Sequence, residues 1–325
     1  MQATIEAGLA RLAAELGGPI TGLRQLSGGA SKETWAFEAG LHHLILRRSP
    51  GGAAITNAVS LATEAALIRA AGAAGVPTPH VVRVCTPQDG LDEAFIMSAV
   101  EGETLGRRIV RDGAFAAVRG ELARRCGEVM ARIHSVSTAD LPPLETHDAV
   151  GVIDRYEVLY REIGAQRPVL EAAFRWLKDA APKHAGTVLV HGDFRNGNLM
   201  IHPGKGLTAV LDWELAHLGD PAEDLGWICV NSWRFGGDAQ VGGFGRYVDL
   251  LRGYRDGGGR HIELSEVRYW QAVGSLKWGV MCLMMYAAYA SGRDPSVERA
   301  MIGRRASEAE IDLVGLMEHG LEHGL

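Results

Sequence analysis

The segment 189–214, LVHGDFRNGNLMIHPGKGLTAVLDWE, restricts the possible folds more than any other part of this sequence. It places Asp193, Asn198 and Asp212 among glycine-rich turns between two apolar runs, VLVHG and TAVLDW, which we predict to be two short strands. Mg²⁺ takes oxygen ligands and engages only one or two protein groups when phosphate and water supply the others. Asn198 and Asp212 suit that duty, which leaves Asp193 to accept a hydroxyl proton. The spacing therefore indicates a magnesium-nucleotide site.

The sequence around this segment predicts a strand-rich part followed by a helical part. After an opening helix, alternating apolar residues and glycine turns predict strands within 22–40, 41–48, 81–87 and 93–100, and an Ala- and Leu-rich helix over 60–75 that stops at Gly75. Beyond residue 110, apolar residues recur at helical spacing, as around 152–180, 240–256, 264–290 and 296–320. We therefore expect an α+β fold.

HGDFRNGN followed by LDWE resembles the Brenner-type motif of the aminoglycoside phosphotransferase and choline kinase-like family. Within that family, LDWELAHLGDPAEDLGW is similar to the kinase-like domains that are fused to acyl-CoA dehydrogenases. The resemblance covers nearly the whole chain and implies a bilobal protein kinase-like fold. It implies a small antiparallel β-sheet lobe over 1–98, a hinge at 99–102, and a larger, mostly helical lobe over 103–325 that holds the catalytic loop and the acceptor pocket.

The same resemblance implies that the chain binds ATP, or GTP in its place, together with Mg²⁺. The loop LSGGASKETW is in position to cover the nucleotide phosphates, where glycines allow close approach of backbone N–H groups. It fits neither the Rossmann nor the Walker A pattern. The nucleotide-binding residues expected on these grounds are Ser27, Gly28, Gly29 and Ser31 in the loop, Arg47 and Glu64, and Ser98 and Val100 beside the adenine.

The third strand departs from the family pattern, because Arg47 stands where most kinases place a lysine. We expect Arg47 to anchor the phosphates together with Glu64, and Arg48 to point to the opposite face of the strand. Asp193 is expected to be the catalytic base. Arg195, where protein kinases carry a lysine aimed at the transferred phosphate, is expected to stabilise charge on the moving group.

Other polar residues near the motif have supporting roles in this interpretation. His191 orients the loop, and Asp224 holds it from the following helix, as the kinase fold implies. Glu214 lies two residues beyond Asp212, so on a strand it would share the same face. GDPAED predicts a helix start in which Asp220 is the N-cap and Glu223 closes a capping box.

The leading prediction is an ATP-dependent phosphotransferase that moves the γ-phosphate to a hydroxyl of a small molecule. One alternative is a kinase-fold module that binds nucleotide without catalysis, which nucleotide turnover would distinguish. The other is a metal-dependent hydrolase in which His191 and Asp193 are metal ligands, with His202 and His217 as candidates for the rest.

The amino-acid composition limits which classes of partner the protein is expected to bind. A net charge of -6 and a pI near 6.1 give no general attraction to nucleic acid or anionic lipid. Four scattered cysteines and the absence of a signal-peptide pattern lead us to expect a cytoplasmic protein. The segment WGVMCLMMYAAYA is too short to span a bilayer and predicts a core helix.

The helix predicted over 268–290 bears on the acceptor. It is rich in Trp and Met and poor in acids, whereas a polycationic aminoglycoside requires clustered carboxylates. We therefore expect a neutral or anionic acceptor with an apolar part, such as a hydroxyacyl compound. The sequence does not predict an oligomeric state.

Overall fold

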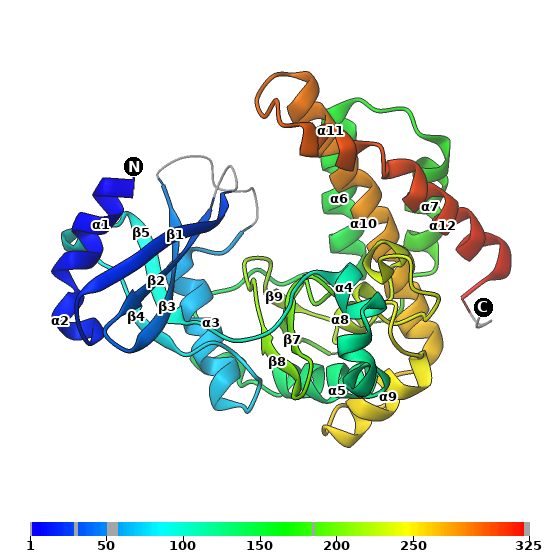
Figure 1. Cartoon of the computed structure of the whole chain (residues 1–325). Helices are drawn as coiled ribbons and strands as arrows, with labels where there is room; N and C mark the ends of the chain where they lie inside the picture. The colour runs from blue at the N-terminus through cyan, green and yellow to red at the C-terminus, as the bar shows by residue number, and fades with distance from the viewer. Residues whose placement is uncertain (1, 29–31, 51–57, 184–185, 322–325) are drawn as a thin grey trace.

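The computed structural model describes residues 2–28, 32–50, 58–183 and 186–321, which form a small part built on a β-sheet and a larger helical part (Figure 1). The strands are β1 Ile20–Gly28, β2 Glu33–Ala39, β3 His42–Ser49, β4 Val81–Val84, β5 Glu93–Ser98, β6 Val188–Val190, β7 Leu199–His202, β8 Gly206–Val210 and β9 His217–Gly219. The helices are α1 Gln2–Arg11, α2 Ala13–Leu16, α3 Leu61–Ala73, α4 Gly106–Arg111, α5 Ala116–His134, α6 Ala149–Ile163, α7 Pro168–Asp179, α8 Ala222–Trp227, α9 Tyr247–Asp256, α10 Leu264–Ala290, α11 Val297–Gly303 and α12 Ala306–His319. Single 3-10 turns lie at Pro87–Asp89, Gly113–Phe115, Thr138–Asp140 and Asn231–Arg234.

The sheet has the strand order β1-β2-β3-β5-β4, and all its pairings are antiparallel. Alternation along the strands gives it two different faces. Trp35 and Phe37 of β2 turn toward α1 and α2 and form a small apolar core with them. Ala36, Ile45 and Met97 stand opposite one another across β2, β3 and β5, and they line a cavity on the other face. The sheet thus separates a core from a cavity.

Helix α3 begins and ends as the sequence predicted. Ser60 caps its N-terminus by accepting a hydrogen bond from the Thr63 N–H at 3.1 Å. Gly75 then takes the left-handed φ of 81° that stops the helix. Leu61 and Ile68 join the large core that continues into the helical part. This packing presents Glu64 toward the junction of the two parts.

The helical part is organised around α10. This helix packs against α6, α7, α8, α11 and α12 (Figure 1), and it is buried from Val267 to Val280 without a break. It is the predicted core helix. Among the residues that the structure describes, no helix is both long and apolar enough to cross a membrane.

The motif segment itself holds three strands, whereas the sequence interpretation gave it two. β6 pairs with β9, and β7 pairs with β8, so the LMIH run forms a strand that the sequence pattern did not predict. The TAVLDW strand ends at Val210, because Asp212 takes a left-handed φ of 65° that is incompatible with extended backbone. The prediction that Glu214 shares a strand face with Asp212 is therefore wrong.

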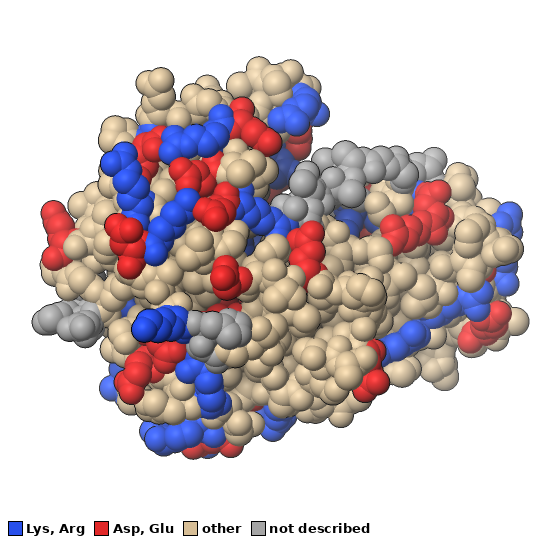
Figure 2. All heavy atoms as spheres, turned by 180° about the vertical axis from the view of Figure 1, so that it is seen from behind, with Lys and Arg blue, Asp and Glu red and all other residues tan. Residues whose placement is uncertain are grey.

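Charged side chains of both signs are mixed on the face shown in Figure 2. Basic and acidic residues stand side by side over the helical part and again over the sheet-containing part. Interspersed charges of opposite sign largely cancel beyond a Debye length. This face therefore carries no extended field of one sign.

Candidate active site

Asp193 lies in the loop that follows β6, and three side chains hold its carboxylate. Oδ1 accepts hydrogen bonds from Trp227 Nε1 at 2.7 Å and from Arg195 Nε at 3.0 Å. Oδ2 accepts one from Asn198 Nδ2 at 2.6 Å. The side chain keeps 13% of its surface exposed. Asp193 is thus fixed in orientation yet open to a second molecule, which a general base requires.

Asn198 and Asp212 lie next to each other although they belong to different turns. The backbone N–H of Leu211 donates to the Asn198 carbonyl at 2.9 Å, which ties the two turns together. Both side-chain bonds of Asn198 use Nδ2, so its amide oxygen is the atom that it can offer to a cation. One amide oxygen and one carboxylate fit the donor set of Mg²⁺, which takes its other ligands from phosphate and water.

Asp212 also belongs to an ion cluster that joins the sheet to the motif. Arg47 contacts Glu64 at 3.1 Å through Nε and Asp212 through Nη2. Lys32 contacts Glu64 at 3.2 Å and Glu214 at 2.8 Å. Burial raises the pKa of the Asp212 carboxyl, but Arg47 and Lys32 outweigh burial and hold that pKa below its usual range. The cluster has two cations and three carboxylates, a surplus of negative charge that suits a divalent cation.

Sequence reasoning identified part of this cluster. It paired Arg47 with Glu64, and Arg48 does point the other way, to Glu33 and Asp92. It did not predict a role for Lys32. The position of this lysine within the glycine loop LSGGASKETW could have suggested a contact with the phosphates. Glu214 reaches the cluster after all, but through the turn that follows Asp212 and not through strand alternation.

Of the other residues expected at a nucleotide site, some lie within the described part of the chain and some outside it. Ser27 and Gly28 end β1, and their backbones pair with the start of β2. Gly29 and Ser31 lie outside the described residues. Ser98 ends β5, and it lines a cavity of about 660 Å³ together with Val100, the sheet row Ala36–Ile45–Met97, and Met200 and Leu211 from the helical part.

Arg195 makes two contacts. Its Nε donates to Asp193 Oδ1, and its guanidinium lies 4.5 Å from the centre of the Trp233 ring. A guanidinium stacked on an aromatic ring keeps its charge while its orientation is restricted. Arg195 is therefore a fixed cation beside the carboxylate of Asp193.

Buried groups support the catalytic loop from behind. Asp224 accepts hydrogen bonds from the backbone N–H groups of His191 and Gly192, at 2.8 and 3.0 Å. His134 lies 3.2 Å from the same carboxylate. Burial raises the pKa of the Asp224 carboxyl, and its bonds and nearby histidines outweigh this and lower it. Asp224 thus holds the loop as an anion, in agreement with the role expected for it.

His191 and Lys277 complete this support. The His191 ring accepts from the Asp193 N–H at 3.2 Å and lies 3.1 Å from the Leu211 carbonyl, so it joins the catalytic loop to the turn before Asp212. Lys277 of α10 donates to the Gly192 carbonyl at 2.9 Å. Sequence reasoning assigned His191 an orienting role and missed Lys277, because nothing in a helical apolar pattern marks a lysine that reaches another element.

The histidines proposed as metal ligands for a hydrolase have other partners. His217 pairs with Glu223 at 3.1 Å, and His202 accepts from the Gly204 N–H at 3.0 Å. The His217 pair also corrects the predicted capping box at α8. Asp220 accepts from the Ala222 N–H at 2.8 Å, but the N-cap residue is Pro221 and not Asp220. Glu223 pairs with His217, so it does not close a capping box.

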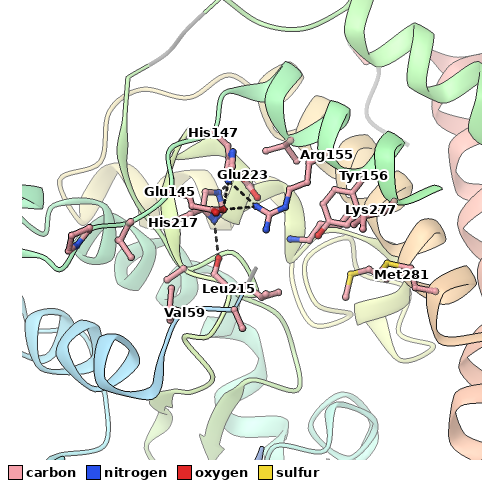
Figure 3. A pocket seen from close by; sticks show the side chains of 17 residues that line it. Val59, Glu145, His147, Arg155, Tyr156, Leu215, His217, Glu223, Lys277 and Met281 are labelled. Carbon is pink, nitrogen blue, oxygen red and sulfur yellow. Dashed lines mark hydrogen bonds and ion pairs between the residues drawn. The ribbon is translucent and has the colours of Figure 1, made fainter. Parts of the chain in front are cut away.

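A second cavity, of about 310 Å³, lies among the helices (Figure 3). Its walls come from α6, α8 and α10, from His217 of β9 and from the turn that follows Asp212. Lys277, which bonds the residue before Asp193, points into it. The structure therefore has one cavity beside the sheet and one among the helices, and Lys277 links the second cavity to the catalytic loop through Gly192.

Comparison with known proteins identifies the family. The phosphotransferase enzyme family matches residues 22–259. Acyl-CoA dehydrogenase family member 10 of Mus musculus is 29% identical over 246 residues, covering 74% of this chain and 22% of that protein. Family member 11 of Homo sapiens is 28% identical over 217 residues, covering 62% of this chain and 27% of that protein. The chain thus spans about a quarter of the length of these relatives.

Solved structures show the same fold. A candidate aminoglycoside phosphotransferase from Ralstonia eutropha superposes with a TM-score of 0.74 at 22% identity, covering 95% of this chain and 96% of that one. A choline/ethanolamine kinase family protein from Mesorhizobium loti gives 0.62 at 23% identity, covering 98% and 94%. The chain belongs to the phosphotransferase enzyme family and has the kinase-like fold that its sequence predicted.

Proposed function

We propose that this member of the phosphotransferase enzyme family moves the γ-phosphate of ATP to a hydroxyl group of a small molecule. The main support for the proposal is the arrangement of side chains in the HGDFRNGN loop and at Asp212. Asp193 is fixed and partly exposed, and Asn198 and Asp212 offer oxygen ligands beside it. Phosphoryl transfer needs these parts, a base for the acceptor and a metal site for the phosphates, within one loop system.

The cavity beside the sheet is the proposed nucleotide site. Ala36, Ile45 and Met97 give it an apolar wall that suits a purine, and the backbone at Ser98 and Val100 borders it. We propose residues 1–98 as the nucleotide-binding lobe, 99–102 as the hinge and 103–325 as the lobe that carries the catalytic loop and the acceptor pocket. Two phosphotransferases with this fold were solved with ADP and with AMP-PNP, and nucleotide use here is proposed by analogy with them.

The ion cluster gives Arg47 and Lys32 a role toward the phosphates. Both cations are held by Glu64, which is buried and fixed on α3, so their positions are set before nucleotide binds. Each can exchange a contact with Asp212 or Glu214 for a phosphate oxygen while it keeps Glu64. Bound Mg²⁺, held by Asn198 and Asp212, would neutralise charge on the phosphates. Mg²⁺ bound to the Asp212 carboxylate would also compete with Arg47 for that group.

The transfer step itself is assigned to groups of this chain. The acceptor hydroxyl gives its proton to Asp193 as its oxygen forms a bond to the γ-phosphorus, and the bond from that phosphorus to the departing ADP oxygen breaks. Trp227 and Asn198 hold the carboxylate, so the base does not need to reorient. Arg195 lies beside Asp193 and stabilises the negative charge that moves through the site.

The acceptor is proposed to be neutral or anionic and partly apolar. The cavity among the helices exposes Met281 and Met284, together with Arg155 and Lys277. Structural neighbours include phosphotransferases solved with hygromycin B and spectinomycin, but an aminoglycoside would bring its cations to a site that already contains two. The four cysteines are free, which fits a reducing compartment, and we propose that the reaction takes place in the cytoplasm.

The proposal is tested by measuring ADP release from ATP and Mg²⁺ over hydroxylated metabolites, hydroxyacyl thioesters and aminoglycosides. We expect turnover with a hydroxylated compound that is neutral or anionic, and its loss in Asp193→Asn. Tight nucleotide binding with no turnover for any acceptor would favour a binding module instead. Efficient phosphorylation of kanamycin would contradict the proposed acceptor class.

A further inference from the structure

The cavity among the helices has a specific arrangement of charge. Arg155 of α6 contacts Glu145 at 3.2 Å and His147 at 2.9 Å, and His147 lies 3.1 Å from the same Glu145 carboxylate (Figure 3). On another wall, His217 pairs with Glu223. Each acidic group of the cavity therefore already has a basic partner from this chain.

Lys277 is different. Its side chain is buried, with 6% of the residue surface exposed, and its Nζ donates to the Gly192 carbonyl. The ammonium lies 4.4 Å from the centre of the Trp227 ring and 5.9 Å from that of Tyr156. Within the described part of the chain, no carboxylate oxygen lies within 4.0 Å of it. Lys277 is thus a buried cation at a cavity wall whose contacts are a carbonyl and two aromatic rings.

Such a lysine remains charged here. Burial lowers the pKa of the Lys277 ammonium, but its interactions with Tyr156 and with the Glu223, Asp193 and Asp224 carboxylates outweigh burial and raise it. The bond to the Gly192 carbonyl uses one of the three N–H donors of the ammonium. The other donors can bond an anionic group that enters the cavity.

We propose that this cavity binds an anionic group of the acceptor, a carboxylate or a phosphate, on the ammonium of Lys277, with Arg155 as the second cation. The apolar part of the same molecule packs against Leu159, Met281 and Met284, which line the cavity. Because Lys277 bonds Gly192, the residue before Asp193, the anionic group and the hydroxyl to be phosphorylated belong to one small molecule. This inference rests on the proposed function for the identity of the cavity as the acceptor site.

The test measures binding and does not depend on turnover. Calorimetric titration of the whole protein compares four probes of one chain length: hexanoate, hexyl phosphate, the neutral hexanamide and the cationic hexylamine. We expect hexanoate or hexyl phosphate to bind at least about tenfold more tightly than hexanamide, and hexylamine to bind more weakly still. The tighter of the two anions identifies the group. Equal binding of hexanamide, preference for hexylamine, or binding of none of the four would overturn the proposal.

Variants then locate the site. Lys277→Met keeps the length of the side chain and removes the charge, so the preference for the anion over hexanamide should disappear. Arg155→Gln should reduce it by about threefold, because Arg155 already shares Glu145. Lys205→Met, at an exposed turn outside the cavity, is the matched control and should behave as wild type. Anion preference that survives Lys277→Met would also overturn the proposal.

Folding and function are separated within the same experiment. The ranking of the four probes on the wild-type protein needs no variant, so it decides the inference even if Lys277→Met unfolds when it loses the Gly192 contact. An anion preference in a protein that never turns over ATP would refute the proposed function and leave the anion site standing. Turnover of a hydroxylated acceptor by a protein without anion preference would support the proposed function and refute the anion site.

Discussion

The two sides of the catalytic loop are built on different principles. On the sheet side, Arg47 and Lys32 share one buried carboxylate, Glu64, and each also contacts Asp212 or Glu214. On the helix side, Lys277 contacts a carbonyl and aromatic rings. In the first arrangement, ion pairs hold both cations before a ligand arrives. In the second, the cation makes no ion pair within 4.0 Å in the described part of the chain and can form one with a ligand.

The difference suggests that the sheet side recognises the nucleotide and that the helix side selects the acceptor. Cations held by fixed carboxylates can contact any triphosphate at the same place, and their side chains are ordered in advance. A buried cation without a carboxylate partner selects for the charge of what enters, because a neutral or cationic ligand leaves it unmatched. Nucleotide and acceptor recognition should therefore respond differently to the same kind of mutation.

The largest effect should come from Asp193. Asp193→Asn keeps the size of the side chain but removes the base, so kcat should fall by about 10²- to 10⁴-fold while the Kd for ATP changes little. Asp212→Asn should in addition weaken binding of the magnesium nucleotide, because it removes a metal ligand and a contact of Arg47. Steady-state kinetics and nucleotide titration measure both quantities.

Asp140→Asn, on an exposed turn, is the matched control for these variants and should leave kcat and nucleotide binding unchanged. If Asp193→Asn and Asp212→Asn lose nucleotide affinity equally, the division between base and metal ligand is wrong.

Mutations of two arginines should affect different kinetic constants, one through the transition state and the other through binding of ATP in the ground state. Arg195 contacts Asp193, so Arg195→Ala should mainly lower kcat, by roughly tenfold to a thousandfold. Arg47 is anchored on Glu64, so Arg47→Ala should mainly raise the KM for ATP. Exposed Arg175 of α7 gives the control Arg175→Ala. Wild-type kinetics in both variants would show that the phosphate-binding cations lie elsewhere.

Lys32 should contribute less than Arg47, because its contacts are to Glu64 and Glu214 and not to Asp212. We expect Lys32→Met to raise the KM for ATP by about threefold to tenfold and to leave the KM for the acceptor unchanged, as one lost charge-assisted hydrogen bond would. Varying ATP and acceptor separately tests this. A larger change in the acceptor KM would contradict the assignment of the ion cluster to the nucleotide side.

The smallest effect concerns the pH dependence of stability. Burial lowers the pKa of His217, but the Glu223 carboxylate outweighs burial and raises it, against a weaker opposing effect of Lys277. A raised folded-state pKa stabilises the protein fully below the unfolded value, about 6.5, and this stabilisation is lost as the pH rises through the folded-state pKa. His217→Gln should therefore cost more stability at pH 6 than at pH 9.

Urea denaturation of wild type and variant at the two pH values measures the difference in free energy of unfolding. His261→Gln, which alters an exposed histidine that also pairs with a glutamate, is the control and should show no such dependence. A gap between wild type and His217→Gln that grows with pH would mean that burial, and not Glu223, controls this histidine.

The sequence by itself determined the fold and much of the sheet side of the site. Strand alternation separated Arg47 from Arg48, a serine cap and a glycine stop bounded α3, and the fixed spacing of HGDFRNGN brought Asp193 and Asn198 onto one loop. Periods and short motifs are local properties, so they can be read without knowledge of what packs against them.

Only the tertiary structure decided the contacts made between elements distant in the chain. Glu223 looked like part of a capping box and instead pairs with His217 across two elements. Asp212 ended a predicted strand, yet its backbone is left-handed and its side chain contacts Arg47 of the sheet. In the sequence, Lys277 is part of an apolar helix pattern. In the folded protein, helix packing places it against Gly192 and at the cavity wall. Partners of buried charges are chosen by three-dimensional proximity, which no local pattern in the sequence records.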